Sequence, residues 1–487
     1  MSKSKSEWAS ARTTIGLTGM PFAETIGGAF MAGMFLLYLT DYAGLGVLGS
    51  TMAPLILVIG RLIDFVIDPL LGWVIDSAKP RPFGKYRFFS LISIVLVSVA
   101  TLLLFSIPEA LKTRQALLFI WILAFYLLYS AASSLFTIYP LIQSIIPDTS
   151  RRSRLLSLQR LTSISIGVFF SFFMMLVNRL NERLEDFSRS FSTMASLFIG
   201  IALVISLTSL FLVHEGYERN QENPRIEIKD ILDIFRKNKA ITVNTASHLF
   251  RGLVFMLMTA TATYYTKWAY CTDPLTGEVY AALFGRIMVI NGVVVLGPML
   301  LAAVVSPHLI HRLGSAIRLI DLSSLICAAG GLLMFALQVT GVLSGSYVLF
   351  IVLLAVMIFG SGLNSVPSQI INLECIDYNV YLTGKSMAGM IHALSRLLGK
   401  AQQALSTLAV GILLAAVGYN VDSSSGNYAG DLANIPVMLS GFLVISALLP
   451  AIFSLISILI NRLYPINEQI RQEMLHQQAI TKTEDIV

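Results

Sequence analysis

The sequence predicts an all-α membrane protein whose chain crosses the bilayer twelve times. Of its 487 residues, 55% are hydrophobic and only 13% are charged, and the mean hydropathy is +0.75. A soluble domain carries about 25% charged residues, so this composition excludes a soluble globular protein and a disordered chain. The apolar residues run in continuous stretches, which excludes the alternating pattern of a transmembrane β-barrel.

A helix needs about 20 predominantly apolar residues to cross the hydrocarbon core. Twelve stretches meet this requirement: 19–40, 49–75, 88–107, 116–143, 158–178, 191–213, 241–266, 281–305, 316–340, 346–371, 386–418 and 434–461. The polar segment ahead of the first stretch lacks a signal-peptide cleavage site, so we expect the first stretch to remain as a span.

The longest polar interruption separates the sixth stretch from the seventh. We therefore expect an N-terminal six-helix bundle over 1–213, a cytoplasmic linker over 214–240, a C-terminal six-helix bundle over 241–461 and a cytoplasmic tail over 462–487. Within the linker, apolar residues recur at i, i+3, i+4 and i+7, at Ile228, Ile231, Leu232 and Phe235. This spacing favours an amphipathic helix on the membrane surface over a simple solvated linker.

Lysine and arginine in the loops indicate the orientation, because cytoplasmic loops of membrane proteins are enriched in basic residues. With both termini in the cytoplasm, 22 of the 34 Lys and Arg fall in cytoplasmic segments and six in outer loops. We therefore expect a multi-pass protein of the plasma membrane with both termini cytoplasmic. The same distribution accounts for the net charge of +6 without a nucleic-acid partner.

Motifs of enzymatic and metal chemistry are missing from the sequence. Cys271, Cys327 and Cys375 are scattered, without the spacing of a metal site or a disulfide framework. No HExxH or GxSxG motif occurs, and the six histidines are dispersed. We expect neither an enzyme nor a bound cofactor or metal.

Apart from Arg318 and Asp321 near the cytoplasmic end of the ninth predicted span, nine charged residues lie inside the predicted spans. They are Glu24, Arg61, Asp64, Asp68, Arg160, Arg251, Arg286, Arg396 and Lys400. A charge at the bilayer centre costs about 2.5–3.5 kcal/mol on insertion scales, so these side chains must face a shared interior, paired or hydrated. This pattern favours a polar pathway for transport over a purely structural membrane protein.

The second span carries three of these charges on one helix face. Arg61, Asp64 and Asp68 fall at i, i+3 and i+7, so their side chains lie close together around the helix. Two neighbouring carboxylates cannot both ionise cheaply in a low dielectric, so they hold a cation or one of them holds a proton. An arginine–aspartate clamp between helices is the structural alternative.

The eleventh span carries a basic stripe. His392, Arg396 and Lys400 recur every four residues, and Gln403 lies one turn beyond. A long basic side chain near a helix end can reach the membrane surface. Lys400, however, lies near the middle of its apolar stretch, so we expect it to face the interior.

Four segments resemble one transporter family. They are FLLYLTDYAGL, GRLIDFVIDPLLGWVIDSAKPRPFGKYR, ECIDY with LTGKS, and Gly399-Lys400 in the eleventh span. Their order over most of the chain resembles the glycoside–pentoside–hexuronide:cation symporters, the melibiose permease family of the major facilitator superfamily. The resemblance implies a major facilitator fold, with two six-helix bundles that rock around a central site.

The resemblance also implies roles for individual residues. The family's cation-coupling positions correspond here to Asp64, Asp68 and Lys400. Its conserved cytoplasmic loop corresponds to a gating loop with Asp76, Lys79, Arg81, Lys85 and Arg87. Candidates for contact with the solute are Glu24, Thr25, Arg160, Arg396, Gln403 and Tyr139.

Departures from the family pattern bear on the cation and the solute. Sodium-using relatives carry an asparagine and a threonine where this sequence has Ile67 and Arg396, which favours a coupling proton over sodium. The fourth span, 116–143, lacks the carboxylate that galactoside carriers use. Basic residues outnumber acidic ones inside the spans, which favours an anionic solute such as a hexuronate or glucuronide.

The sequence therefore predicts a monomeric symporter that imports a sugar, glycoside or sugar acid together with H+ (or Na+). Two alternatives stay open. One is a transporter of lysolipids or other amphiphiles on the same fold, because distant relatives carry such cargo. The other is a transporter-like sensor that does not transport.

Overall fold

The computed structural model describes most of the chain. The described residues are 11–43, 52, 55–60, 63–64, 67–68, 70–71, 74–75, 78–79, 81–112, 114–145, 149–215, 236–383, 388–422, 425–467 and 469–474. Within these ranges the protein is helical, and β structure is limited to two isolated bridges in loops, Thr272 with Val279 and Val421 with Tyr428. The all-α prediction is confirmed.

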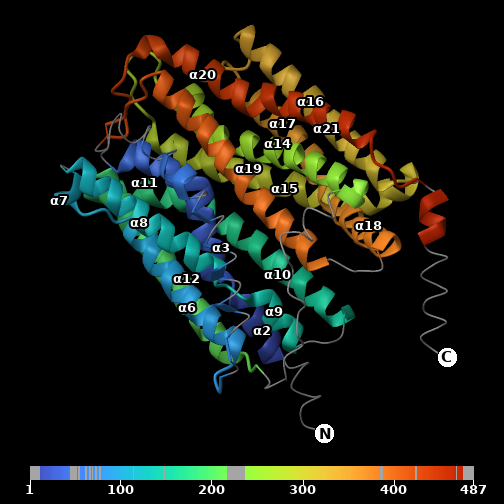
Figure 1. The fold of residues 1–487 in the computed structure, drawn as a ribbon. Helices are drawn as coiled ribbons and strands as arrows, with labels where there is room; N and C mark the ends of the chain where they lie inside the picture. The colour runs from blue at the N-terminus through green and yellow to red at the C-terminus, as the bar shows by residue number, and fades with distance from the viewer. Residues whose placement is uncertain are drawn as a thin grey trace. The chain divides into compact units, whose positions relative to one another are not determined.

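The first half of the chain contributes these helices: α2 (Ala11–Gly19), α3 (Phe22–Ala29), η1 (Phe30–Met34), α4 (Phe35–Leu37), η2 (Tyr38–Tyr42), α6 (Lys85–Leu104), α7 (Glu109–Lys112), α8 (Gln115–Ser134), α9 (Ile138–Ile145), α10 (Thr149–Phe170), α11 (Phe173–Leu184) and α12 (Phe187–Leu212). The second half contributes α14 (Lys239–Tyr270), α15 (Ala281–Leu313), α16 (Ala316–Val339), α17 (Tyr347–Gly362), α18 (Ser365–Thr383), α19 (Ala388–Ala416), η3 (Leu432–Asn434), α20 (Ile435–Leu443), η4 (Val444–Leu448) and α21 (Leu449–Asn461) (Figure 1).

Ten of the twelve predicted spans are confirmed as helices long and apolar enough to cross a membrane. The second and fifth do not reach this length and hydropathy within the described residues. The second is described only at scattered helical positions between 52 and 75. The fifth, predicted over 158–178, crosses the break between α10 and α11.

The chain folds into two compact units. Unit 1 comprises Met1–Gln221, Thr266–Leu296 and Thr407–Leu439. Unit 2 comprises Glu222–Tyr265, Gly297–Ser406 and Ser440–Val487. In unit 1, α6 packs against α8 and α12, and the first span packs against α12 (Figure 1). In unit 2, α16 packs against α17 and α21.

An aromatic core holds the first span in unit 1. Phe30 lies 4.9 Å, between ring centroids, from both Phe105 and Phe170, and Phe173 lies 4.9 Å from Phe191. The rings meet at tilted and edge-on angles, which their quadrupoles favour. The span itself contains two π-helical turns, η1 and η2. Such turns shift the side-chain register and are common at functional sites.

A carboxylate caps the start of α6. Glu215, which follows α12, accepts hydrogen bonds from the backbone N–H groups of Lys85, Tyr86 and Arg87 at 3.2, 3.2 and 2.9 Å. These N–H groups have no partner within their own helix, and the helix dipole favours an anion there. Gly84 precedes them with φ +98°, a conformation that glycine adopts without strain. The cap therefore fixes the predicted gating loop to the end of α12.

The first part of the predicted tail docks on unit 2. Ile466 and Met474 are buried against residues of α14, α16 and α18. Glu374 accepts a hydrogen bond from the Tyr464 hydroxyl at 2.9 Å and forms an ion pair with Arg471 at 2.7 Å. Most of the predicted amphipathic helix in 214–240 lies outside the described residues.

Candidate functional site

Three acidic side chains of unit 1 accept hydrogen bonds from serines of α8; Asp64 is buried, and Glu24 and Asp68 are half-buried. Glu24 on α3 accepts a hydrogen bond from Ser133 at 3.0 Å. Asp64 accepts one from Ser130 at 2.5 Å, and Asp68 accepts one from Ser134 at 2.6 Å. We call this set the carboxylate–serine row.

Helical periodicity explains why the row forms. Asp64 and Asp68 lie one turn apart, and so do Ser130 and Ser134 on α8. Two facing helices with the same four-residue repeat bring the two pairs into register. Asp64 is only 2% exposed, so its contact with the serine replaces water.

The chemistry of the row depends on the neutrality of its serines. A hydroxyl group donates a hydrogen bond to an ionised carboxylate and can equally accept one from a protonated carboxyl group. A serine therefore holds the carboxyl group in position in both its ionised and its protonated form. Carboxylate and hydroxyl oxygens are also ligands that hard cations accept. The arrangement can hold a proton or a small cation.

The other residues predicted for coupling and solute binding are described to different extents. Thr25 is half-buried next to Glu24, and Tyr139 on α9 is 63% exposed. Lys400 and Gln403 are half-buried on α19. Arg160 lies on α10 and His392 and Arg396 lie on α19, but their side chains, like the whole of Arg61, are outside the described residues.

The predicted gating loop is described in part. Lys79 and Arg81 are exposed, and the Arg81 guanidinium lies 3.8 Å from the centre of the Phe88 ring. Arg87 is buried and donates hydrogen bonds to the carbonyl groups of Phe83 at 3.0 Å and Leu210 at 3.3 Å. Arg87 thus binds the loop to its own unit. Asp76 lies outside the described residues.

The serine partners were not predicted from the sequence. The fourth span lacks a carboxylate, but its segment YSAASS places three serine hydroxyl groups at i, i+3 and i+4 in an otherwise apolar helix. That spacing puts them on one face, and it was the available signal. These serines donate hydrogen bonds to acidic side chains on neighbouring spans.

A second buried acid has a very different partner. The Lys267 ammonium lies 2.6 Å from Asp41, and both side chains are fully buried in unit 1. The Tyr419 hydroxyl donates a hydrogen bond to Asp41 at 2.9 Å and accepts one from the Trp268 indole at 3.0 Å. The Trp268 ring also lies 4.5 Å from the ammonium, within cation–π range.

This ion pair corrects one assignment from the sequence. The predicted seventh span, 241–266, ends one residue before Lys267 and so places this lysine in the outer loop that follows. In the structure α14 continues through Tyr270, and Lys267 lies inside it. Trp268 and Tyr270 follow Lys267, so aromatic residues continue along α14 after the charged residue.

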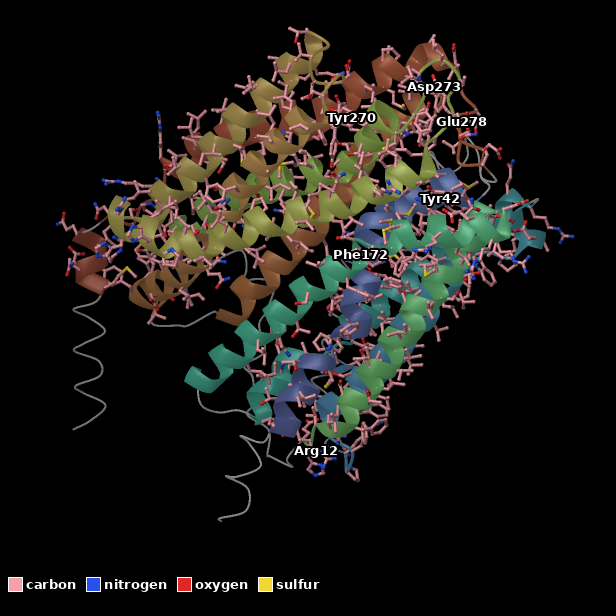
Figure 2. All side chains as sticks on the ribbon, turned by 180° about the vertical axis from the view of Figure 1, so that it is seen from behind. Arg12, Tyr42, Phe172, Tyr270, Asp273 and Glu278 are labelled. Carbon is pink, nitrogen blue, oxygen red and sulfur yellow. The ribbon has the colours of Figure 1, made fainter. Side chains whose placement is uncertain are left out.

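Two loops cover the ion pair. The Val279 N–H donates to the Asn427 side chain at 2.8 Å, and the Tyr428 N–H donates to the Gly277 carbonyl at 2.9 Å. Figure 2 shows Tyr42, at the end of the first span, on the same side of the unit as this loop region with Asp273 and Glu278, and opposite Arg12. Burial raises the pKa of the Cys271 thiol to about 12, while Lys267 opposes that shift.

Comparison with known proteins gives matches along nearly the whole chain. A family model described as MFS/sugar transport protein matches residues 19–468. A protein named Uncharacterized symporter YnaJ from Bacillus subtilis (strain 168) is 22% identical over 95% of this chain and 93% of its own length. A protein named Glucuronide carrier protein homolog from Escherichia coli (strain K12) is 22% identical over 95% of this chain and 94% of its own length.

Solved structures show the same fold. The xylose transporter XylE from E. coli, in a partially occluded inward-open conformation, aligns with a TM-score of 0.60 at 13% identity, over 95% of this chain and 99% of its own. The nucleoside transporter NupG aligns with a TM-score of 0.58 at 12% identity, over 92% of this chain and 98% of its own. At this identity the likeness concerns the fold alone.

Proposed function

We propose that this protein is a cation-coupled symporter for a sugar-like solute. The chain belongs to the family of MFS/sugar transport proteins, and it is a multi-pass membrane transporter rather than an enzyme. The predicted resemblance is confirmed at the level of this family. The observation that carries the proposal is the carboxylate–serine row. A carboxylate that exchanges a hydrogen bond with a neutral hydroxyl group can take up a proton without losing that contact, which is what a coupling site requires.

The coupling step follows from the charge of the row. An ionised, buried carboxylate is costly, and binding a proton or cation removes that cost. The row with a bound proton or cation is therefore more stable than the empty row when the site is shielded from water. Loading with a cation allows the site to be enclosed together with the solute.

A proton fits this row better than sodium. A proton needs one carboxylate, whereas a sodium ion needs several oxygen ligands to replace its water shell. Ile67, on the same helix as the two aspartates, offers none. The serine hydroxyl groups do supply oxygen atoms, which makes sodium the second candidate.

For the solute we propose an anionic sugar, such as a hexuronate or glucuronide. Basic residues outnumber acidic ones within the predicted spans, and the printed name of one relative is that of a glucuronide carrier homologue. The basic loops favour an orientation in the plasma membrane with both termini in the cytoplasm. We propose that the solute is imported together with the coupling cation.

The test uses purified protein in liposomes with an imposed pH gradient and labelled sugars. We expect the gradient to drive accumulation of solute. Asp64→Asn and Asp68→Asn should abolish accumulation but retain exchange of internal for external solute. Accumulation that follows a sodium gradient at fixed pH would contradict proton coupling, and accumulation by the double Asn variant would contradict the assignment of the site.

A further inference from the structure

Arg251 on α14 is a buried cation whose hydrogen bonds, among the described residues, go to neutral amide groups. It is 5% exposed and donates one hydrogen bond to Asn364 at 3.2 Å and one to Asn244 at 3.1 Å. Its Nε–H has no hydrogen-bond partner. Within the part of the chain that the structure describes, no carboxylate forms an ion pair with it.

This environment replaces only part of the hydration that the Arg251 guanidinium loses on burial. A buried charge needs an opposite charge and filled hydrogen bonds to offset its lost hydration. Amide oxygens are neutral, and they make weaker bonds to a guanidinium than a carboxylate does. Asp321 on α16 interacts with Arg251 only at longer range and accepts a hydrogen bond from Asn461 at 2.7 Å.

The free edge of Arg251 is the one that recognises carboxylates. Nε and Nη2 form a fork that donates two parallel hydrogen bonds to a carboxylate. Among the described residues, Nε has no hydrogen-bond partner and Nη2 donates to the Asn244 amide. Asn244 also lines a small cavity between α14, α18 and α19, together with His248 and Asn372. This cavity has room for about one water molecule, so the Asn244 amide has limited space into which it can move.

Arg251 and Glu24 occupy nearly the same position along the spans that open the two halves of the chain. Both residues lie in 32-residue spans that open their halves of the chain, at the fourteenth position for Glu24 and the thirteenth for Arg251. Their partners lie in the fourth spans of the two halves, Ser133 at the nineteenth position and Asn364 at the eighteenth. Repeat architectures build transport sites from such corresponding positions.

We infer that Arg251 binds the carboxylate of an anionic, hydroxylated solute, of the sugar-acid class, through Nε and Nη2. This inference rests on the proposed transport function and adds to it a specificity-determining residue. The solute carboxylate displaces the Asn244 amide from the fork and supplies the charge that the guanidinium lacks.

The experiment compares an acid with its neutral analogue, D-glucuronate with D-glucose, in binding and in liposome uptake. Arg251→Gln should weaken binding of the acid at least tenfold and leave the neutral sugar within twofold. Arg251→Lys keeps the charge but loses the two parallel donors. Its affinity for the acid should lie between that of the wild type and that of Arg251→Gln. Asp321→Asn is the matched control, and it should not weaken binding of the acid.

Further outcomes separate this inference from the proposed function. Equal losses for both sugars in Arg251→Gln, or the same loss in Asp321→Asn, would overturn the role of Arg251 while leaving the transporter intact. A wild-type protein that carries neutral sugars and not acids would also overturn it. Transport of neither sugar would remove the proposed function itself. If Arg251→Gln does not fold, Asn364→Asp gives the guanidinium an internal carboxylate and should block the acid selectively.

Discussion

The carboxylate–serine row and the Asp41–Lys267 pair are two ways of burying acids in the same unit. In the row, Asp64 and Asp68 each accept a short hydrogen bond from a neutral hydroxyl group. Asp41 instead lies 2.6 Å from an ammonium group and accepts further bonds from Thr40 and Tyr419. The serine contacts are neutral, whereas the lysine contact is charged.

We expect that difference to separate a site that changes its charge from a contact that keeps it. A serine hydroxyl group can donate to a carboxylate or accept from a carboxyl group, so this contact survives protonation. A carboxylate beside lysine cannot, because protonation would strand the buried ammonium. The ion pair joins residues 41, 267 and 419, which are distant in sequence, so we expect it to hold that end of unit 1 closed until water can solvate both charges.

The largest expected effect comes from removing one member of the ion pair. Lys267→Met should lower the free energy of unfolding by about 3–5 kcal/mol, because it leaves a buried carboxylate unpaired. The double variant Asp41→Leu with Lys267→Met should recover most of the loss. Asp64→Asn is the control from the row, and it should cost much less, since serine remains a partner for the amide. Thermal unfolding in detergent measures all three.

Equal losses in Lys267→Met and Asp64→Asn would remove the distinction between the two regions. A double variant no more stable than Lys267→Met would show that packing around Lys267, and not its charge, holds the contact.

A second prediction uses Cys271, which follows α14 directly. Burial raises the pKa of its thiol to about 12, so almost none is ionised at pH 8. An exposed thiol has a pKa near 8.5 and reacts as the thiolate. Asp41→Asn, which weakens the closed end, should therefore speed maleimide labelling of Cys271 by about a hundredfold or more.

This labelling is measured in a background where the other two buried cysteines, Cys327 and Cys375, are replaced by alanine. Asp68→Asn is the control, and it should leave the labelling rate unchanged. Fast labelling of Cys271 in both variants would mean that the ion pair does not control access to this end.

The two regions also show how far the sequence predicts a membrane site. The spacing of Asp64 and Asp68 predicted a shared helix face, because helical periodicity is local and needs no knowledge of neighbours. Their serine partners were not predicted, since the register between two spans depends on packing. Lys267 was misplaced because a hydropathy window ends at a charge, and only the partner from the first span reveals that the charge is buried.

A third, smaller effect concerns the serines. Ser130→Ala and Ser134→Ala each remove the hydrogen bond that positions one carboxylate of the row. A side-chain hydrogen bond contributes about 0.5–1.5 kcal/mol, so we expect proton-driven uptake to fall by about twofold to tenfold. Ser130→Thr and Ser134→Thr keep a hydroxyl group and should restore most of the uptake. Wild-type uptake in both alanine variants would show that the serines only fill space.

The smallest expected effect tests whether burial, rather than distance, gives the Asp41–Lys267 pair its strength. Arg471 and Glu374 form an ion pair of nearly the same length, 2.7 Å, but their side chains are 32% and 12% exposed. Water screens such a pair, so Arg471→Gln should lower the free energy of unfolding by only about 0.2–1 kcal/mol. Glu374 keeps its hydrogen bond from Tyr464 in this variant, which limits the loss further. Thermal unfolding of Arg471→Gln beside Lys267→Met gives the comparison directly. A loss of 3 kcal/mol or more in Arg471→Gln would mean that docking of the tail segment, and not exposure of the pair, sets its strength.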